Sequence, residues 1–238
     1  MTECRGHLNP RDPDVRLQRL PVDDRLGELA RHVWVGRWDI PGGQTRRQQV
    51  LTYPGCNIAV MPSEAALHGP ALKLGNRDLC GKSWVVGVLL QPAAARTLPR
   101  TPPRQLVDSS EPLPAGPWRE IRELMTTGTD GEVVEVLERW LLPYAELVDE
   151  TGRLVNAACQ VAEHEPAIVT SAALAERLGV ADRTLRRRTH RGHREVAHRT
   201  APPAARRRDA PAEPVGVTGG AGGGARLRRP GALHPPLP

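Results

Sequence analysis

Residues 170–188 read T-S-A-A-L-A-E-R-L-G-V-A-D-R-T-L-R-R-R, and this stretch decides the architecture of the C-terminal part of the chain. Thr170 can cap a helix, because a threonine hydroxyl accepts a hydrogen bond from an unsatisfied amide of the first turn. Gly179 permits the tight turn that ends this helix, and Val180 fills the space between it and a second helix. The spacing therefore predicts a helix-turn-helix over residues 166–190.

The two predicted helices bury one face and expose another. The buried face of the first helix is predicted from its apolar residues, which are Ala172, Leu174, Ala175 and Leu178. The second helix starts at Ala181 or Asp182 and directs Leu185 inwards. Its exposed face consists of Arg183, Thr184, Arg186 and Arg187. A guanidinium fork can bind guanine in the major groove or a phosphate, so this face is predicted to bind double-stranded DNA. The alternative is a solvated basic helix in an ordinary bundle.

The chain upstream of this stretch changes from strand-like to helix-like character. Short β-branched or aromatic runs separated by Pro and Gly predict a β-rich sandwich or barrel-like domain over residues 17–98. Residues 1–16 are expected to be a flexible lead-in and residues 99–117 a Pro-rich linker. Apolar residues then recur at steps of three and four, which predicts a helical connector over residues 118–165. The predicted fold class is α+β.

Several motifs resemble those of one known protein family. The sequence L-A-E-R-L-G-V-A-D-R-T-L-R-R, from Leu174 to Arg187, resembles the first helix-turn-helix of AraC-type (AraC/XylS) transcriptional regulators. W-D-I-P-G-G-Q, P-G-C-N-I-A-V and L-C-G-K-S-W-V-V-G-V-L-L-Q-P are similar to an uncharacterised β-rich domain that commonly precedes that module. The resemblance implies a sequence-specific DNA-binding regulator whose β-domain senses a small-molecule effector or dimerises. The chain departs from the family at Ala181, where a capping serine is usual, and Asp182 is expected to take that role.

The end of the chain departs further from this family. Residues 191–238 are predicted to be a disordered basic tail, because they are rich in Pro and Gly and poor in apolar residues. The segment 227–238 can be encoded by codons that, read one base forward, give Y-A-D-Q-A-H-F-T-R-L-F. That translation resembles the second helix-turn-helix of the AraC-type module. We therefore expect a frameshift near Arg188 and only the first helix-turn-helix intact.

Composition and charge exclude other function classes. The whole net charge of +6 lies in residues 189–238, which hold nine Arg and three acidic residues. Four cysteines without a C-x-x-C pair indicate buried thiols and a reducing compartment, and no long apolar run is present, so a cytoplasmic protein is expected. No clustered His and carboxylate ligands, P-loop or nucleophile elbow is found, so neither an enzyme nor a metal or cofactor site is expected. The runner-up is a small-ligand-binding β-domain with a non-functional DNA-binding remnant. Its pocket would be lined by tryptophans that more often belong to a core, namely Trp34, Trp38 and Trp84.

Overall fold

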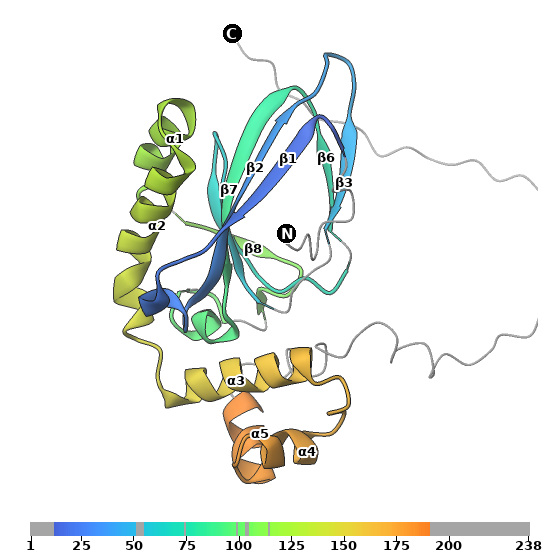
Figure 1. Cartoon of the computed structure of the whole chain (residues 1–238), viewed down its shortest axis with the longest axis vertical. Coiled ribbons are helices and arrows are strands. Elements are labelled where there is room, and N and C mark those ends of the chain that lie inside the picture. Colours follow the sequence, from blue (N-terminus) through green and yellow to red (C-terminus); the bar gives the residue numbers. More distant parts are fainter. Residues whose placement is uncertain are drawn as a thin grey trace, which may run out of the picture.

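The computed structural model describes residues 12–50, 55–73, 75–98, 100–102, 105–113 and 115–190. Strands fill the first half of the described chain and α-helices the second (Figure 1). The strands are β1 (Val15–Leu20), β2 (Ala30–Asp39), β3 (Arg46–Val50), β4 (Asn57–Val60), β5 (Ala65–His68), β6 (Gly75–Leu79), β7 (Lys82–Leu90) and β8 (Ser110–Pro112). The helices are α1 (Trp118–Thr127), α2 (Asp130–Ala145), α3 (Glu150–His164), α4 (Ser171–Arg177) and α5 (Asp182–His190), with short 3-10 helices η1 (Asp24–Leu26) and η2 (Pro92–Arg96).

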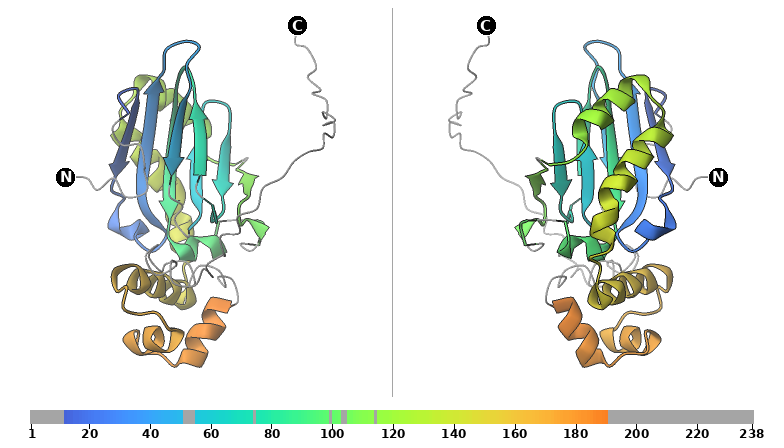
Figure 2. Two further views of the ribbon diagram at one scale, coloured as in Figure 1. Left: turned by 90° about the vertical axis from the view of Figure 1, so that its right-hand side faces the viewer. Right: turned by 90° about the vertical axis from the view of Figure 1, so that its left-hand side faces the viewer.

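Six strands form one antiparallel sheet in the order β1-β2-β7-β4-β5-β8, and β3 pairs separately with β6. At the centre of the sheet, Val33 of β2 lies opposite Val88 of β7, and Val35 lies opposite Val86. Alternate side chains of a strand share a face, so all of these valines lie on one face of the sheet. Each is at most 1% exposed, and α1 and α2 cover this face (Figure 2, right).

The helices α1 and α2 supply the second layer of the core. Ile121 of α1 and Leu137 and Leu141 of α2 are fully buried in the same cluster as the sheet valines. Steps of three and four residues place apolar side chains on one side of a helix. The amphipathic pattern that begins at Trp118 therefore builds a layer on the sheet and buries that side against it.

The structure confirms an α+β chain in which an antiparallel β-domain is followed by helices. The expected sandwich or barrel-like arrangement is wrong for the described residues. The second layer of the core is helical, and the separate small sheet consists of β3 and β6. The strand pattern could not distinguish these cases, because an apolar sheet face can be buried by a helix pair or by another sheet.

The structure also differs from the predicted linker and connector. Leu106, in the expected linker 99–117, is 2% exposed within the main core, and β8 adds an edge strand to the sheet. Residues 118–165 do not form one connector, because α1 and α2 belong to the core of the β-domain, whereas α3 shares a separate small core with α4 and α5. Strand β1 starts inside the expected lead-in, of which residues 1–11 lie outside the described chain.

The tryptophans expected either in a core or around a pocket lie on both faces of the sheet. Trp84 packs against the helix-covered core. Trp34 and Trp38 have the opposite parity in the β2–β7 register, so they lie on the other face and are half-buried. The Trp34 indole Nε1 donates a 2.9 Å hydrogen bond to Asn57 Oδ1. Tryptophans on two faces cannot line a single pocket.

Gly87 provides the space that the Trp34 indole occupies. A Cβ atom added at Gly87 would lie 2.1 Å from the indole ring. We expect Gly87→Ala to lower the free energy of unfolding by about 2 kcal/mol, because the ring must move and lose its bond to Asn57. Chemical denaturation measures this loss. The control is Gly42→Ala, where the added Cβ meets no atom within 4 Å, and equal stability of the two variants would contradict the prediction.

Candidate nucleic-acid interface

The helices α3, α4 and α5 form a small unit with a core of its own. Its buried side chains are Ala158 of α3, Leu174 and Ala175 of α4, and Leu185 of α5. Partly buried apolar residues surround this core, namely Leu154, Val161, Ile168, Leu178 and Val180. The unit lies at one end of the β-domain, with α3 between the sheet and the other two helices (Figures 1 and 2).

The connection between α4 and α5 has the geometry that its sequence predicts. The Thr170 hydroxyl accepts a 3.2 Å hydrogen bond from the Ala173 amide at the start of α4. Gly179 has φ +66°, the left-handed conformation that favours glycine. The amides of Gly179 and Val180 donate to the carbonyls of Glu176 and Ala175, at 3.0 Å each. These two bonds form a Schellman motif, which ends α4 and turns the chain into α5.

The structure places the predicted inward residues as expected, with one exception. Leu174 and Leu185 are buried, Leu178 and Val180 are half-buried, and Gly179 forms the turn. Ala172 was expected on the buried face, but it is exposed. Its side chain points away because Leu174, Ala175 and Leu178 already define the buried side of this short helix.

The four residues expected to contact DNA differ in their surroundings. Arg183 and Arg187 are one helical turn apart and exposed, and neither guanidinium has a hydrogen-bond or ion-pair partner in the described part of the chain. Thr184 is half-buried between them. Arg186 is exposed, and its Nε lies 2.8 Å from Asp182 Oδ2. This pair is a favourable i, i+4 arrangement and is the main reason that the pKa of Asp182 is lowered.

Asp182 does not replace the capping serine of the AraC-type pattern. Its carboxylate binds Arg186 along α5, and the carbonyl of Ala181 accepts hydrogen bonds from the amides of Thr184 and Leu185. An aspartate in the first turn still interacts favourably with the helix dipole. Asp182 thus stabilises α5 through its charge and holds Arg186.

A contact that the sequence did not reveal attaches this unit to the β-domain. Asn156 of α3 is 9% exposed, and its Oδ1 accepts a 2.9 Å hydrogen bond from the Ala93 amide in η2. Its Nδ2 donates to the carbonyl oxygen and to Oε2 of Glu28, at 2.8 Å each. Arg31 and Glu163 form an ion pair of 2.9 Å beside it. One face of α3 thus contacts the β-domain while another supports α4 and α5.

Comparison with known families assigns part of the chain. Residues 18–112 match a domain of unknown function, DUF6597. The match runs from within β1 to the last residue of β8 and stops before the helices α1 to α5. No curated protein and no solved structure matches the chain. The DUF6597 segment is therefore β-rich, and the two helices that complete its core come from the sequence after it.

The DUF6597 segment holds two partly buried histidines, each with a pKa below its usual value. Burial, followed by the charges of Arg19 and Arg31, lowers the pKa of His32 to about 4. Burial and then Arg77 lower the pKa of His68, against an opposing effect of Glu64. Protonating either ring would place a positive charge in a half-buried site beside another positive charge.

These shifts predict a loss of stability in mild acid. The unfolded pKa of His32 is 6.5 and the folded one about 4, so the unfolded chain binds more protons between these values. The free energy of unfolding should therefore fall as the pH is lowered from 6.5 towards 4. We expect the double variant His32→Gln/His68→Gln to lose much of this fall, as measured by denaturation at several pH values. An unchanged pH profile would contradict the assignment.

Predictions from the sequence also concern the thiols, a metal site, the membrane and the C-terminal tail. Cys56 and Cys159 are buried, and burial raises the pKa of each thiol to about 12, whereas Cys80 is exposed. No group of three His, Cys, Asp or Glu side chains gathers as a metal site within the described ranges. None of the helices placed between residues 12 and 190 is both long and apolar enough to cross a membrane. The basic tail 191–238 and the expected frameshift lie outside the described residues.

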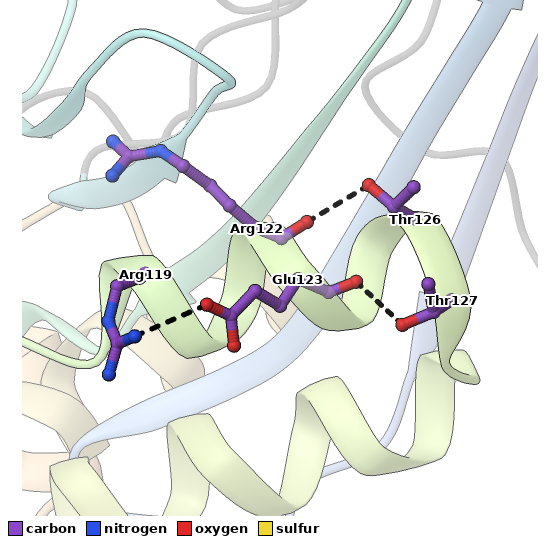
Figure 3. A pocket seen from close by; sticks show the side chains of 5 residues that line it. All are labelled: Arg119, Arg122, Glu123, Thr126 and Thr127. Atoms are coloured by element: carbon purple, nitrogen blue, oxygen red, sulfur yellow. Dashed lines mark hydrogen bonds and ion pairs between the residues drawn. The ribbon is translucent and has the colours of Figure 1, made fainter.

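A hollow of about 440 Å³ lies on the outer side of α1, and its polar side chains bind other groups of the protein (Figure 3). Arg119 and Glu123 form an ion pair of 3.5 Å, and the Arg122 Nε donates to the Met61 carbonyl. The hydroxyls of Thr126 and Thr127 donate to carbonyls of the preceding turn. The polar side chains of this hollow therefore already have partners in the protein.

Proposed function

We propose that this chain is a sequence-specific DNA-binding transcriptional regulator of the AraC type with one intact helix-turn-helix, α4 to α5. The observation that carries the proposal is the left-handed turn at Gly179, which joins two short helices packed on α3. This turn leaves the unpaired guanidinium groups of Arg183 and Arg187 on the outer face of α5.

The position of these arginines on α5 supports base readout. In helix-turn-helix proteins the N-terminal residues of the second helix contact base edges in the major groove. Arg183 and Thr184 lie in the first turn of α5, and Arg187 follows one turn later on the same side. Arginine binds guanine O6 and N7 with two parallel hydrogen bonds, which need a guanidinium that no carboxylate already holds. Arg186, paired with Asp182, is better suited to a phosphate.

The rest of the proposal follows the resemblance. The DUF6597 domain with α1 and α2 senses a small-molecule effector or joins two copies of the chain as a homodimer, and the regulator acts in the cytoplasm. The hydrogen bonds of Asn156 with Glu28 and Ala93 support such a role, because they connect α3 directly to the β-domain. A change in the β-domain would reach α5 through α3, which contacts the β-domain and shares a core with α4 and α5.

Selection of duplexes from a random pool by the full chain tests the proposal. We expect a short motif to be enriched, of the size that one helix reads in a single major-groove face. Double-stranded DNA is the expected partner, so single-stranded competitor should displace little of the bound duplex. Recovery of duplexes without any enriched motif would reduce the proposed readout to non-specific phosphate binding.

A further inference from the structure

A polar cavity of about 190 Å³ lies where α3 meets the β-domain. The β-domain contributes Glu28, Arg31 and Gln91 to its wall. The side chains of Arg153, Gln160 and Glu163 from α3 line the other side. This cavity is separate from the outer face of α5, so the proposed DNA contacts leave it open.

The volume of the cavity limits the size of a ligand. At about 30 Å³ for each water of liquid density, it holds roughly six waters. Sites for drug-sized ligands begin at about 300 Å³. The cavity therefore suits a small metabolite, and its wall of charged and amide side chains requires a ligand that is polar throughout.

Some polar groups of the cavity wall already bind one another and join the helical unit, α3 to α5, to the β-domain. The Asn156 amide binds Ala93 on one side and Glu28 on the other. Arg31 and Glu163 neutralise each other across the junction. These groups fix the shape of the cavity. A ligand that broke their bonds would lose the binding free energy that its own contacts supply.

Other groups of the wall remain available. Arg153 and Gln160 lie seven residues apart on α3, which places them on the same face of the helix. Within the described chain neither side chain has a hydrogen-bond or ion-pair partner. Glu28 uses Oε2 for Asn156 and keeps its other carboxylate oxygen. The cavity thus offers donors from α3 and an acceptor with negative charge from the β-domain.

We propose that this cavity binds a zwitterionic small molecule, an α-amino acid with an uncharged polar side chain. Its carboxylate pairs with Arg153 and Gln160, and its ammonium group donates to Glu28. A dianion would meet the carboxylates of Glu28 and Glu163, and a dication would meet two guanidinium groups. The ligand touches both parts and therefore holds the helical unit on the β-domain; its effect on DNA binding rests on the proposed function.

Thermal unfolding of the full chain tests this site without DNA, so its outcome is distinct from that of the DNA-binding proposal. The probes are L-serine, L-threonine, L-asparagine and L-glutamine at millimolar concentration, with succinate and putrescine as the dianion and dication. We expect at least one amino acid to raise Tm by about 4 °C or more. Its carboxamide, which lacks the carboxylate, and its N-acetyl derivative, which lacks the ammonium group, should leave Tm unchanged.

Two variants locate the response. Arg153→Gln should abolish the Tm shift, and Arg119→Gln on the outer side of α1 should keep it; both side chains are exposed, so neither change threatens folding. The proposal is overturned if none of the four amino acids raises Tm, if succinate, putrescine or the singly charged derivatives act equally well, or if Arg153→Gln responds as Arg119→Gln does.

Discussion

Restoring the reading frame near Arg188 is expected to raise the affinity for specific DNA by about two orders of magnitude or more over the chain as given. The recovered segment is expected to supply the second helix-turn-helix that the resemblance implies. A tethered second unit binds at a raised effective concentration and can reach a major-groove face about 34 Å from the first. A single unit with a few basic side chains binds weakly and largely through phosphate.

The measurement is a side-by-side titration of the two proteins on the DNA upstream of the gene, at one salt concentration. A matched control is the restored chain with Leu185→Asp, which destroys the core of the first unit and should return the affinity to that of one module. Nanomolar specific binding by the chain as given would contradict the frameshift. Stop codons in the other frame across this stretch would also contradict it, and residues 191–238 would then count as a genuine part of the protein.

Arg183→Ala is expected to weaken binding to the specific duplex by about tenfold to a hundredfold while leaving binding to random duplex nearly unchanged. Arg183 is exposed in the first turn of α5 without a carboxylate partner, so its fork is free to bind a guanine. Arg186→Ala should cost less discrimination, because Asp182 already holds that side chain at 2.8 Å. Fluorescence anisotropy with labelled specific and random duplexes measures both effects.

Two controls separate base readout from general electrostatics. Arg119→Ala removes an exposed arginine far from α5 and should change neither affinity. Replacing arginines of residues 191–238 should lower the affinity for both duplexes equally and flatten its salt dependence, as expected for phosphate contacts. Equal losses on both duplexes for Arg183→Ala would contradict a role in sequence discrimination.

The turn between α4 and α5 could be predicted from sequence because its determinants are local. A threonine cap, a glycine with left-handed φ and the apolar Val180 act within a few residues of one another. Ala172 was predicted to be buried, but it is exposed. In a helix as short as α4, apolar composition does not fix which side faces the core.

The packing partners of the sheet could not be predicted in the same way. Residues 118–145 carry a clear helical pattern, but the pattern does not show which element their apolar side packs against. A helical connector and a helical layer on the sheet would have the same pattern. Strand β8 (Ser110–Pro112) lies within the predicted linker 99–117, because it is short and carries no apolar alternation, which an edge strand does not need. The hydrogen bonds of Asn156 join residues more than 60 positions apart, and no local sequence pattern predicts them.

The proposed function requires that this chain reads DNA sequence through α5. The most direct test is the ratio of its dissociation constants for a shuffled duplex and for the duplex enriched from the random pool, at one salt concentration. We predict a ratio of about ten or more, since one bidentate arginine supplies roughly that discrimination. A ratio of one, with binding that depends only on salt, would contradict sequence-specific recognition by this protein.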